Sequence, residues 1–284
     1  MAAVELACYA LYSSQGYNPS RRSRLLQPML VSSLFFWSFL GTSFLLCSML
    51  LQDYWAHPQL TIRTVLGSSL LVSLGSATVM SFIARRYSFS RMLERMTAAP
   101  ISLSGIATGF GALTGKMGVS GVSLREALSG SAFSISLSGQ GVVAMSPKLA
   151  GSLSSDETDA VLAHELSHIK NGDSAAKGLA KLARVAFPFD PVLRLVEAAV
   201  HRERELWADK VSVEFTGKPL ALASAIVKAN SESSGAATSN LAGLFVGGSG
   251  HGLLSLYPNL ERRVDILLEM ARRMEIANSP LVVA

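Results

Sequence analysis

Two histidines and a glutamate stand close together at His164, Glu165 and His168, in the pattern His-Glu-x-x-His. On an α-helix, residues four apart leave the same face one turn apart, so both imidazoles could bind one metal ion at roughly 2.0–2.1 Å. Glu165 would then stand beside the metal, where a general base can take a proton from water. The spacing is typical of zinc-dependent hydrolysis, although three such residues also fall together by chance.

The sequence around this pattern predicts the helix that the chemistry requires. Ser154 and Glu157 form a capping-box pattern before it, and an apolar run follows at 160–163. Gly172 comes shortly after His168 and is a typical helix end. We therefore expect both histidines to project from one helix.

A second predicted helix supplies candidates for a third ligand. It begins at Asp190 and Pro191 and ends near Gly217. Glu205 and Asp209 share a face of this helix, and Glu205 as third ligand would leave the fourth zinc position open. Asp209 could hold the free ring N–H of a ligand histidine. The alternative is an exposed helix face that carries salt bridges.

Two motifs now carry a family resemblance, His-Glu-Leu-Ser-His-x-x-Asn-Gly-Asp at 164–173 and Glu-x-x-Ala-Asp at 205–209. They resemble those of the HtpX-like and CAAX prenyl protease family of integral-membrane zinc metallopeptidases. The resemblance covers roughly residues 92–274 and the hydrophobic segments before them. BlaR-type membrane sensor peptidases share both motifs and remain an alternative.

The resemblance implies a role for each matching residue. His164, His168 and Glu205 would bind one zinc ion per chain, Glu165 would be the catalytic base, and Asp209 would support the site. Peptide-bond hydrolysis would then be the reaction.

Just before the last predicted helix, the sequence departs from the family pattern. Many relatives carry Thr-His-Pro followed by Leu-Glu-x-Arg, whereas here Tyr257 takes the histidine position and Arg263 falls on the arginine. A tyrosine hydroxyl could donate a hydrogen bond to the negatively charged oxygen of the transition state. Alternatively, Tyr257 only packs the start of the helix, while Arg263 pairs with Asp209 or Glu261.

Two long uncharged segments predict a membrane anchor. Residues 25–52 and 64–84 carry no charge, and a hydrocarbon core of about 30 Å needs roughly 20 apolar residues. A mean hydropathy of +0.36 agrees with this interpretation. We expect membrane spans at about 28–51 and 64–84. The alternative is a pair of buried core helices in a soluble protein.

Arginine placement predicts the orientation of this anchor in the cell membrane. Arginines cluster outside the pair of segments, at Arg21, Arg22, Arg24, Arg85, Arg86, Arg91 and Arg95. The positive-inside rule puts both ends of the multi-pass protein in the cytoplasm. These arginines also account for much of the net charge of +5 without a nucleic-acid partner. The two cysteines, Cys8 and Cys47, do not suggest a disulfide framework.

The expected fold is mainly α with a small β-hairpin sheet, a gluzincin-type zincin domain behind a two-helix transmembrane anchor. The predicted parts are an N-terminal cytoplasmic segment at 1–24, the membrane hairpin at 25–86 and the peptidase domain at 87–284. Alternating residues predict the two hairpin strands, at 131–137 and 142–146. The Gly/Ser-rich stretches, at 102–130 and 231–252, are typical of linkers, and the first could also be a substrate-gating loop.

The sequence favours a membrane-anchored zinc metalloendopeptidase acting on polypeptides at the lipid bilayer. The resemblance implies misfolded or damaged membrane proteins as substrates. A protease that cuts inside the bilayer is disfavoured, because charged residues bracket the histidine motif. A non-enzymatic membrane protein with a zinc scaffold is disfavoured by the intact Glu165. The sequence does not predict the oligomeric state.

Overall fold

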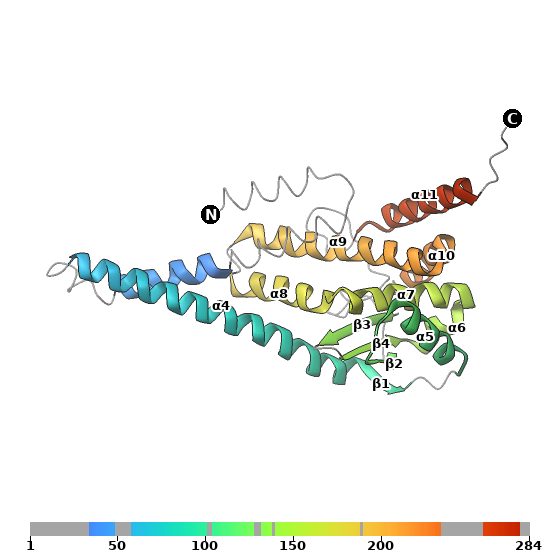
Figure 1. Cartoon of the computed structure of the whole chain (residues 1–284), viewed down its shortest axis with the longest axis horizontal. Helices are drawn as coiled ribbons and strands as arrows, with labels where there is room; N and C mark the ends of the chain where they lie inside the picture. The colour runs from blue at the N-terminus through green and yellow to red at the C-terminus, as the bar shows by residue number, and fades with distance from the viewer. Residues whose placement is uncertain are drawn as a thin grey trace. The chain divides into compact units, whose positions relative to one another are not determined.

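The computed structural model describes seven stretches of the chain, residues 34–48, 58–100, 104–127, 132–137, 140–187, 190–233 and 258–278 (Figure 1). They divide into two compact units. The first unit comprises Met1–Tyr87 and Ala176–Val200, and the second comprises Ser88–Ala175 and His201–Ala284. The residues 176–200 thus group with the N-terminal unit rather than with the rest of 87–284.

The first unit is helical in the residues that the structure describes. It contains a helix at 34–48, most of α4 (Pro58–Met96), most of α8 (Asp173–Ala186) and the start of α9 (Pro191–Thr216). A buried apolar cluster joins the helix at 34–48 to the parts of α8 and α9 in this unit, through residues such as Leu34, Ala180 and Leu193.

Asp190 organises the start of α9 within this unit. Its carboxylate accepts a hydrogen bond from the backbone N–H of Val192 at 2.9 Å, as expected of a residue that caps a helix N-terminus. The other carboxylate oxygen accepts a hydrogen bond from the Trp37 indole at 2.8 Å. The predicted start of this helix at Asp190 and Pro191 is therefore confirmed.

The predicted membrane spans fall on the first unit. Residues 64–84 lie within α4, and part of the other segment is helical at 34–48. Among the helices that the structure describes, none combines the length and the apolar character that crossing a membrane requires. The membrane hairpin therefore stays a prediction.

The second unit contains a four-stranded sheet with the order β1-β2-β4-β3. The strands are β1 (Thr97–Pro100), β2 (Val122–Ala127), β3 (Ala132–Leu137) and β4 (Gln140–Met145). The predicted hairpin is confirmed, because β3 and β4 pair antiparallel, with Phe133 opposite Ala144. Strand β2 pairs parallel with β4 and antiparallel with β1, so the sheet is larger than predicted.

The interpretation of residues 102–130 as a linker or loop is wrong for the part that the structure describes. This part forms α5 (Ser104–Met117) and β2. Phe110, Leu113 and Met117 bury their side chains in the core of the second unit. Gly118 and Gly121 have φ angles of 67° and 69°, which glycine adopts readily, and they turn the chain from α5 into β2. Two of the glycines in this stretch therefore belong to a tight turn and not to a linker.

Helix α7 (Ser155–Lys170) forms the centre of this unit's core. Its residues from Ala160 to Leu166 are all buried, and the helix packs against α5, β3 and α10 (Pro219–Ser233). The predicted capping box is present, since Ser154 Oγ accepts from the Glu157 amide and the Glu157 carboxylate accepts from the Ser154 amide. Helices α6 (Pro147–Ser152) and α11 (Leu260–Asn278), and α9 from His201 onward, also belong to this unit. The prediction of a mainly helical fold with a small sheet is confirmed.

Candidate metal centre

His164 and His168 lie one turn apart on α7, in its buried half. Their ring centroids are 4.8 Å apart and the ring planes stand at 88° to each other. The helix ends just beyond them, at Lys170, with Asn171 as its C-cap, and Gly172 follows with a φ of 65°. The four-residue spacing thus places both imidazoles on the same buried face.

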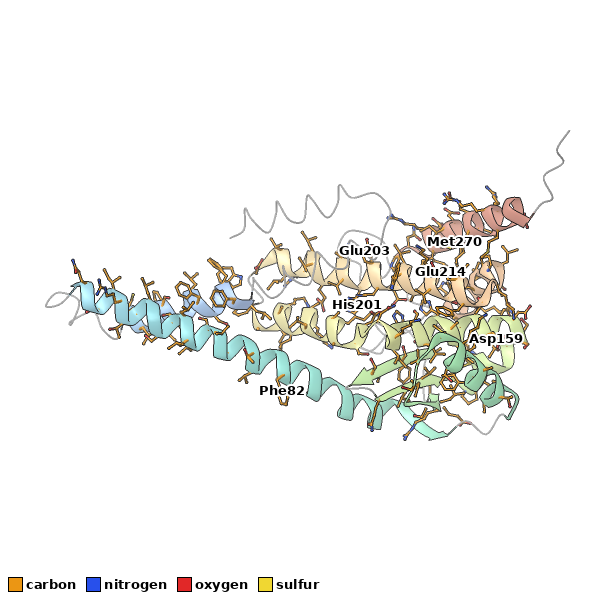
Figure 2. The ribbon with its side chains drawn as sticks, in the orientation of Figure 1. Phe82, Asp159, His201, Glu203, Glu214 and Met270 are labelled. Atoms are coloured by element: carbon orange, nitrogen blue, oxygen red, sulfur yellow. The ribbon has the colours of Figure 1, made fainter. Side chains whose placement is uncertain are left out.

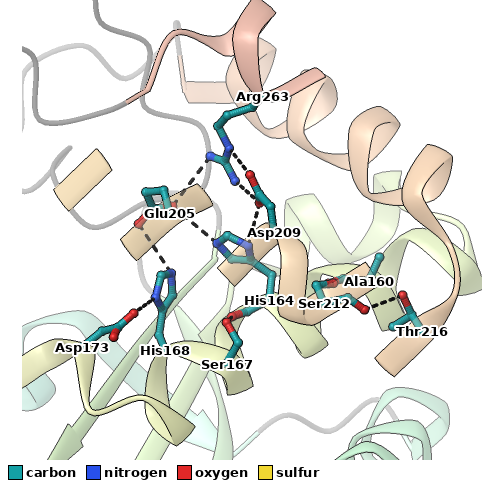
Figure 3. A network of polar contacts seen from close by, with 10 residues as sticks. All are labelled: Ala160, His164, Ser167, His168, Asp173, Glu205, Asp209, Ser212, Thr216 and Arg263. Carbon is teal, nitrogen blue, oxygen red and sulfur yellow. Dashed lines mark hydrogen bonds and ion pairs between the residues drawn. The ribbon is translucent and has the colours of Figure 1, made fainter. Parts of the chain in front are cut away.

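Glu205 comes from α9 and joins the two imidazoles (Figure 3). Its Oε2 lies 3.4 Å from His164 Nε2, and its Oε1 lies 3.5 Å from His168 Nε2. The three residues are buried, and one ligand atom from each lies within 4.8 Å of the other two. Two helices that are separate in the sequence therefore bring three metal-ligand side chains together.

This donor set fits a zinc ion. Tetrahedral zinc with bonds of about 2.0–2.2 Å places its ligand atoms about 3.3 Å apart, close to the distance from each Nε2 atom to the Glu205 oxygen that faces it. Imidazole nitrogen and carboxylate oxygen are common zinc ligands, whereas calcium and magnesium prefer oxygen donors alone. With three protein ligands, one tetrahedral position stays available for water or substrate.

Asp209 and Arg263 hold the other side of the His164 ring. His164 Nδ1 lies 3.0 Å from Asp209 Oδ1. Arg263 on α11 donates from Nε to Asp209 Oδ2 at 2.8 Å and from Nη2 to Oδ1 at 2.6 Å. Of the two partners expected for Arg263, Asp209 and Glu261, the contact observed is the one with Asp209. An acceptor at Nδ1 favours the tautomer whose Nε2 lone pair faces a metal.

Asp173 and Arg204 make a matching set of contacts at the His168 ring. His168 Nδ1 lies 2.7 Å from Asp173 Oδ2, and Arg204 Nη1 donates to Asp173 Oδ1 at 2.5 Å. Our reasoning from the sequence did not assign these two residues to the site. A signal was present, because Asp173 is the last residue of the histidine motif and Arg204 precedes Glu205, but spacing alone does not pair residues 31 apart.

The electrostatic environment favours a positive charge at this position. Burial would lower the pKa of His164, but the carboxylates of Asp209 and Glu205 outweigh burial and raise it to about 9. Burial would raise the pKa of Asp209, but Arg263 and His164 bring it below its ordinary value. Among the described residues of this cluster, four buried carboxylates face two guanidinium groups, at Glu165, Asp173, Glu205, Asp209, Arg204 and Arg263. With both imidazoles neutral, as they must be to bind a metal, a divalent cation would neutralise the remaining two negative charges.

Glu165 lies beside the ligand group without being part of it. Its side chain is buried, at 2% exposure, and it follows His164 directly on α7. Burial would lower the pKa of Arg263, but Asp209, Glu205 and Glu165 raise it, so the Glu165 charge acts on the same cluster. A buried carboxylate next to an open metal position can serve as a general base.

Tyr257 lies outside the described residues, as do the residues 234–252 of the second Gly/Ser-rich stretch. Arg263, which follows Tyr257 by six positions, lies within α11 and contacts Asp209. The structure thus brings together six of the seven residues selected from the sequence, His164, Glu165, His168, Glu205, Asp209 and Arg263.

Comparison with known proteins gives matches to peptidases. The model of the family described as BlaR1 peptidase M56 matches residues 138–240, which include both histidines and Glu205. A protease HtpX homologue from Gemmatimonas aurantiaca is 33% identical over 120 residues, covering 32% of this chain and 43% of that protein. A protease HtpX homologue from Methanopyrus kandleri is 30% identical over 161 residues, covering 43% of this chain and 51% of that protein.

The matched segments span about half the length of these curated relatives. A crystal structure of Ste24p from S. mikatae is similar with a TM-score of 0.48 and 14% identity, covering 78% of this chain and 61% of that chain. The predicted resemblance to the HtpX-like peptidases is confirmed by the family match and the curated relatives.

Proposed function

We propose that this protein is a membrane-anchored zinc metalloendopeptidase with a zincin-type catalytic domain. The observation that carries the proposal is the convergence of His164, His168 and Glu205, with Glu165 buried beside them. This combination of three ligands, an open position and an adjacent carboxylate suits the hydrolysis of peptide bonds.

Each residue of the site has a part in the proposed reaction. Zinc, when bound by His164, His168 and Glu205, would polarise the scissile carbonyl and make the attacking water more acidic. Glu165 accepts the proton of that water and delivers it to the leaving nitrogen. Asp209 Oδ1, which lies 3.0 Å from His164 Nδ1, would accept the proton of that ring nitrogen and keep the Nε2 atom directed toward Glu205.

Strand β3 is the candidate binding edge for the substrate backbone. It ends the described sheet, next to β4, and packs against α7, which carries the histidines. An extended peptide can add to a sheet edge through main-chain hydrogen bonds, with little dependence on its side chains. At one end of this edge, the Ser136 N–H donates to Ser174 Oγ at 3.1 Å, so a substrate would pair with the residues before it.

Exposed apolar side chains support the proposed membrane anchor. Phe44 on the helix at 34–48 is 73% exposed, and Leu71 and Phe82 on α4 are 72% and 64% exposed. Figure 2 shows Phe82 projecting away from the ribbon of α4. Exposed apolar surface on two helices that coincide with long uncharged segments suits contact with lipid.

A test of the anchor uses membranes from cells that express the chain. We expect the protein to stay in the membrane pellet after alkaline carbonate and to leave it only with detergent. A reporter fused after Ala284 should be active in the cytoplasm, where the arginine pattern places both ends. Release by carbonate would contradict the anchor, and a reporter active only outside would contradict the orientation.

A test of the catalytic proposal combines metal analysis with proteolysis. Purified protein should contain one zinc per chain and cleave an unfolded protein such as reduced casein. A chelator should abolish cleavage, and added zinc should restore it. Protein that retains zinc but cleaves neither casein, nor an unfolded membrane protein, nor itself would contradict the peptidase proposal and favour a zinc scaffold.

The family match favours a second candidate function, a BlaR-type sensor peptidase. A quality-control protease would cleave many unfolded membrane proteins at several sites, whereas a sensor would make few cuts in one partner or in itself. Incubation of the protein alone and with an unfolded membrane protein, followed by mass spectrometry of the products, separates the two. A single self-cleavage site without cleavage of the added protein would support the sensor.

A further inference from the structure

We propose that Asp173 and Arg204 are positioning residues that hold His168 in its metal-binding orientation and thereby slow the release of the metal. This inference rests on the proposed function, because it takes the centre of His164, His168 and Glu205 to be a zinc site. It goes further because it assigns a role to the contact between Asp173 and Arg204, two residues that do not occur together in either motif.

The contacts form a chain from α9 to the imidazole. Arg204 Nη1 donates to Asp173 Oδ1 at 2.5 Å, and Asp173 Oδ2 lies 2.7 Å from His168 Nδ1. Arg204 Nη1 also lies 3.4 Å from the carbonyl oxygen of Asn171, where α7 ends. The side chains of Arg204, Asp173 and His168 are all buried, so water does not compete strongly for these hydrogen bonds.

The two histidines differ in what supports their partner carboxylates. Asp209 lies one turn after Glu205 within α9, where the helix itself fixes its backbone. Asp173 instead follows Gly172, whose φ is 65°, at the turn from α7 into α8. A buried carboxylate with only an imidazole for a partner is poorly compensated, so this turn would relax without a cation. Arg204 supplies that cation and also contacts the turn itself.

Arg204 also connects the two kinds of ligand. It precedes Glu205 on α9, so one turn of this helix supplies the ligand Glu205 and also Arg204, which supports His168 through Asp173. A displacement of this turn would loosen Glu205 and His168 together.

The experiment measures zinc dissociation from the full-length holoprotein in detergent, with excess chromophoric chelator. Arg204→Met and Asp173→Asn should each release zinc about 10–100-fold faster than wild type, the size expected for loss of a hydrogen-bonding support. The double variant should release zinc no faster than the faster single variant, because both substitutions interrupt the same series of contacts from Arg204 through Asp173 to His168. Arg204→Lys keeps the charge and should release zinc more slowly than Arg204→Met.

A second readout separates positioning from general destabilisation. After replacement of zinc by cobalt, the visible absorption of Asp173→Asn should shift, because the His168 ring has changed its orientation. Lys228→Met is the matched control: it removes the ion pair of Lys228 with Glu157 at the other end of α7. It should lower the unfolding temperature while leaving the cobalt spectrum and the zinc release rate as in wild type.

The outcomes distinguish this inference from the proposed function. If wild type holds zinc and cleaves, but Arg204→Met and Asp173→Asn release zinc at the wild-type rate with unchanged cobalt spectra, the positioning role is wrong and the peptidase stands. If Lys228→Met accelerates zinc release as much as they do, the effect is one of stability, and the inference is again wrong. If wild type binds no zinc, the proposed function itself fails.

Discussion

Arg263 and Asp209 form a two-point ion pair in the interior of the second unit, with N–O distances of 2.8 and 2.6 Å. Arg263 is 1% exposed, although it belongs to the first turn of α11, 54 positions after Asp209 in the sequence. Because Asp209 also contacts His164, the last described helix is connected to the metal centre. The site therefore depends on residues well beyond the two motifs.

Arg263→Met should destabilise the fold strongly. It leaves the buried carboxylate of Asp209 without its cation, which typically costs about 3–5 kcal/mol. Chemical unfolding in detergent would measure the change. Arg273→Met on the same helix is the control, since Arg273 is exposed and its i,i+4 pair with Glu269 should contribute less than about 1 kcal/mol. Equal stabilities of the two variants would contradict the role of the buried pair.

Glu165→Gln should keep zinc and lose proteolysis. The change removes the base but none of the three ligand side chains, and a positioned base typically contributes about 10²–10⁴-fold to a rate. Zinc content and casein cleavage would be measured on the same preparation. Cleavage at the wild-type rate would show that another group accepts the proton.

Glu205→Ala should lose zinc, whereas Asp209→Ala should bind it about 10–100-fold more weakly. The difference follows from the geometry, because Glu205 faces both Nε2 atoms and Asp209 contacts only the far side of one ring. Zinc titration against a competing chelator would give both affinities. One tightly bound zinc in Glu205→Ala would exclude Glu205 as a ligand.

The fold should lose stability in acid through Glu157. Burial would raise the pKa of Glu157, but hydrogen bonds from Lys228, Ser224 and the Ser154 amide lower it to about 2. Since the folded-state pKa lies below the ordinary 4.5, this contribution is full above pH 4.5 and is lost as pH falls toward 2. Its size should be on the order of 2 kcal/mol.

Unfolding measured from pH 6 to pH 2 would test this effect of Glu157. Glu157→Gln should flatten the pH dependence of the free energy of unfolding over this range. An identical pH dependence in the variant and in wild type would assign the acid sensitivity to other carboxylates.

Tyr257→Phe tests the hydroxyl proposed to stabilise the transition state. If that hydroxyl donates to the developing oxyanion, the turnover number should fall by roughly 10²-fold while zinc content stays the same. Steady-state cleavage of a fluorogenic peptide would measure the change. An unchanged turnover number would leave Tyr257 with a packing role alone.

Local signals explain what the sequence predicted well. Ser154 with Glu157 marked the start of α7, Asp190 with Pro191 marked the start of α9, and alternation marked the β3–β4 hairpin. Each of these signals needs only residues that are close in sequence.

The rest depended on contacts between distant residues. Strand β2 pairs in parallel with β4, which is distant in sequence. The residues before β2 are rich in glycine, a composition typical of linkers, yet they form the packed helix α5. The contact between Asp173 and Arg204 likewise joins residues from two helices, and helical periodicity carries no information about such a pair.

The same contact has a consequence for chain length. Asp173 and Arg204 lie 31 positions apart, and their contact brings together the two ends of a span that contains the residues 176–200 of the first unit. For a flexible loop, the entropic cost of closure rises by only about 0.6 kcal/mol for each doubling of its length. Most of this span is helical, so the closure argument applies to the connection between α8 and α9, from Ala186 to Pro191. A change of length there should leave His168 and Glu205 in register, because it alters neither α7 nor the part of α9 that carries Glu205.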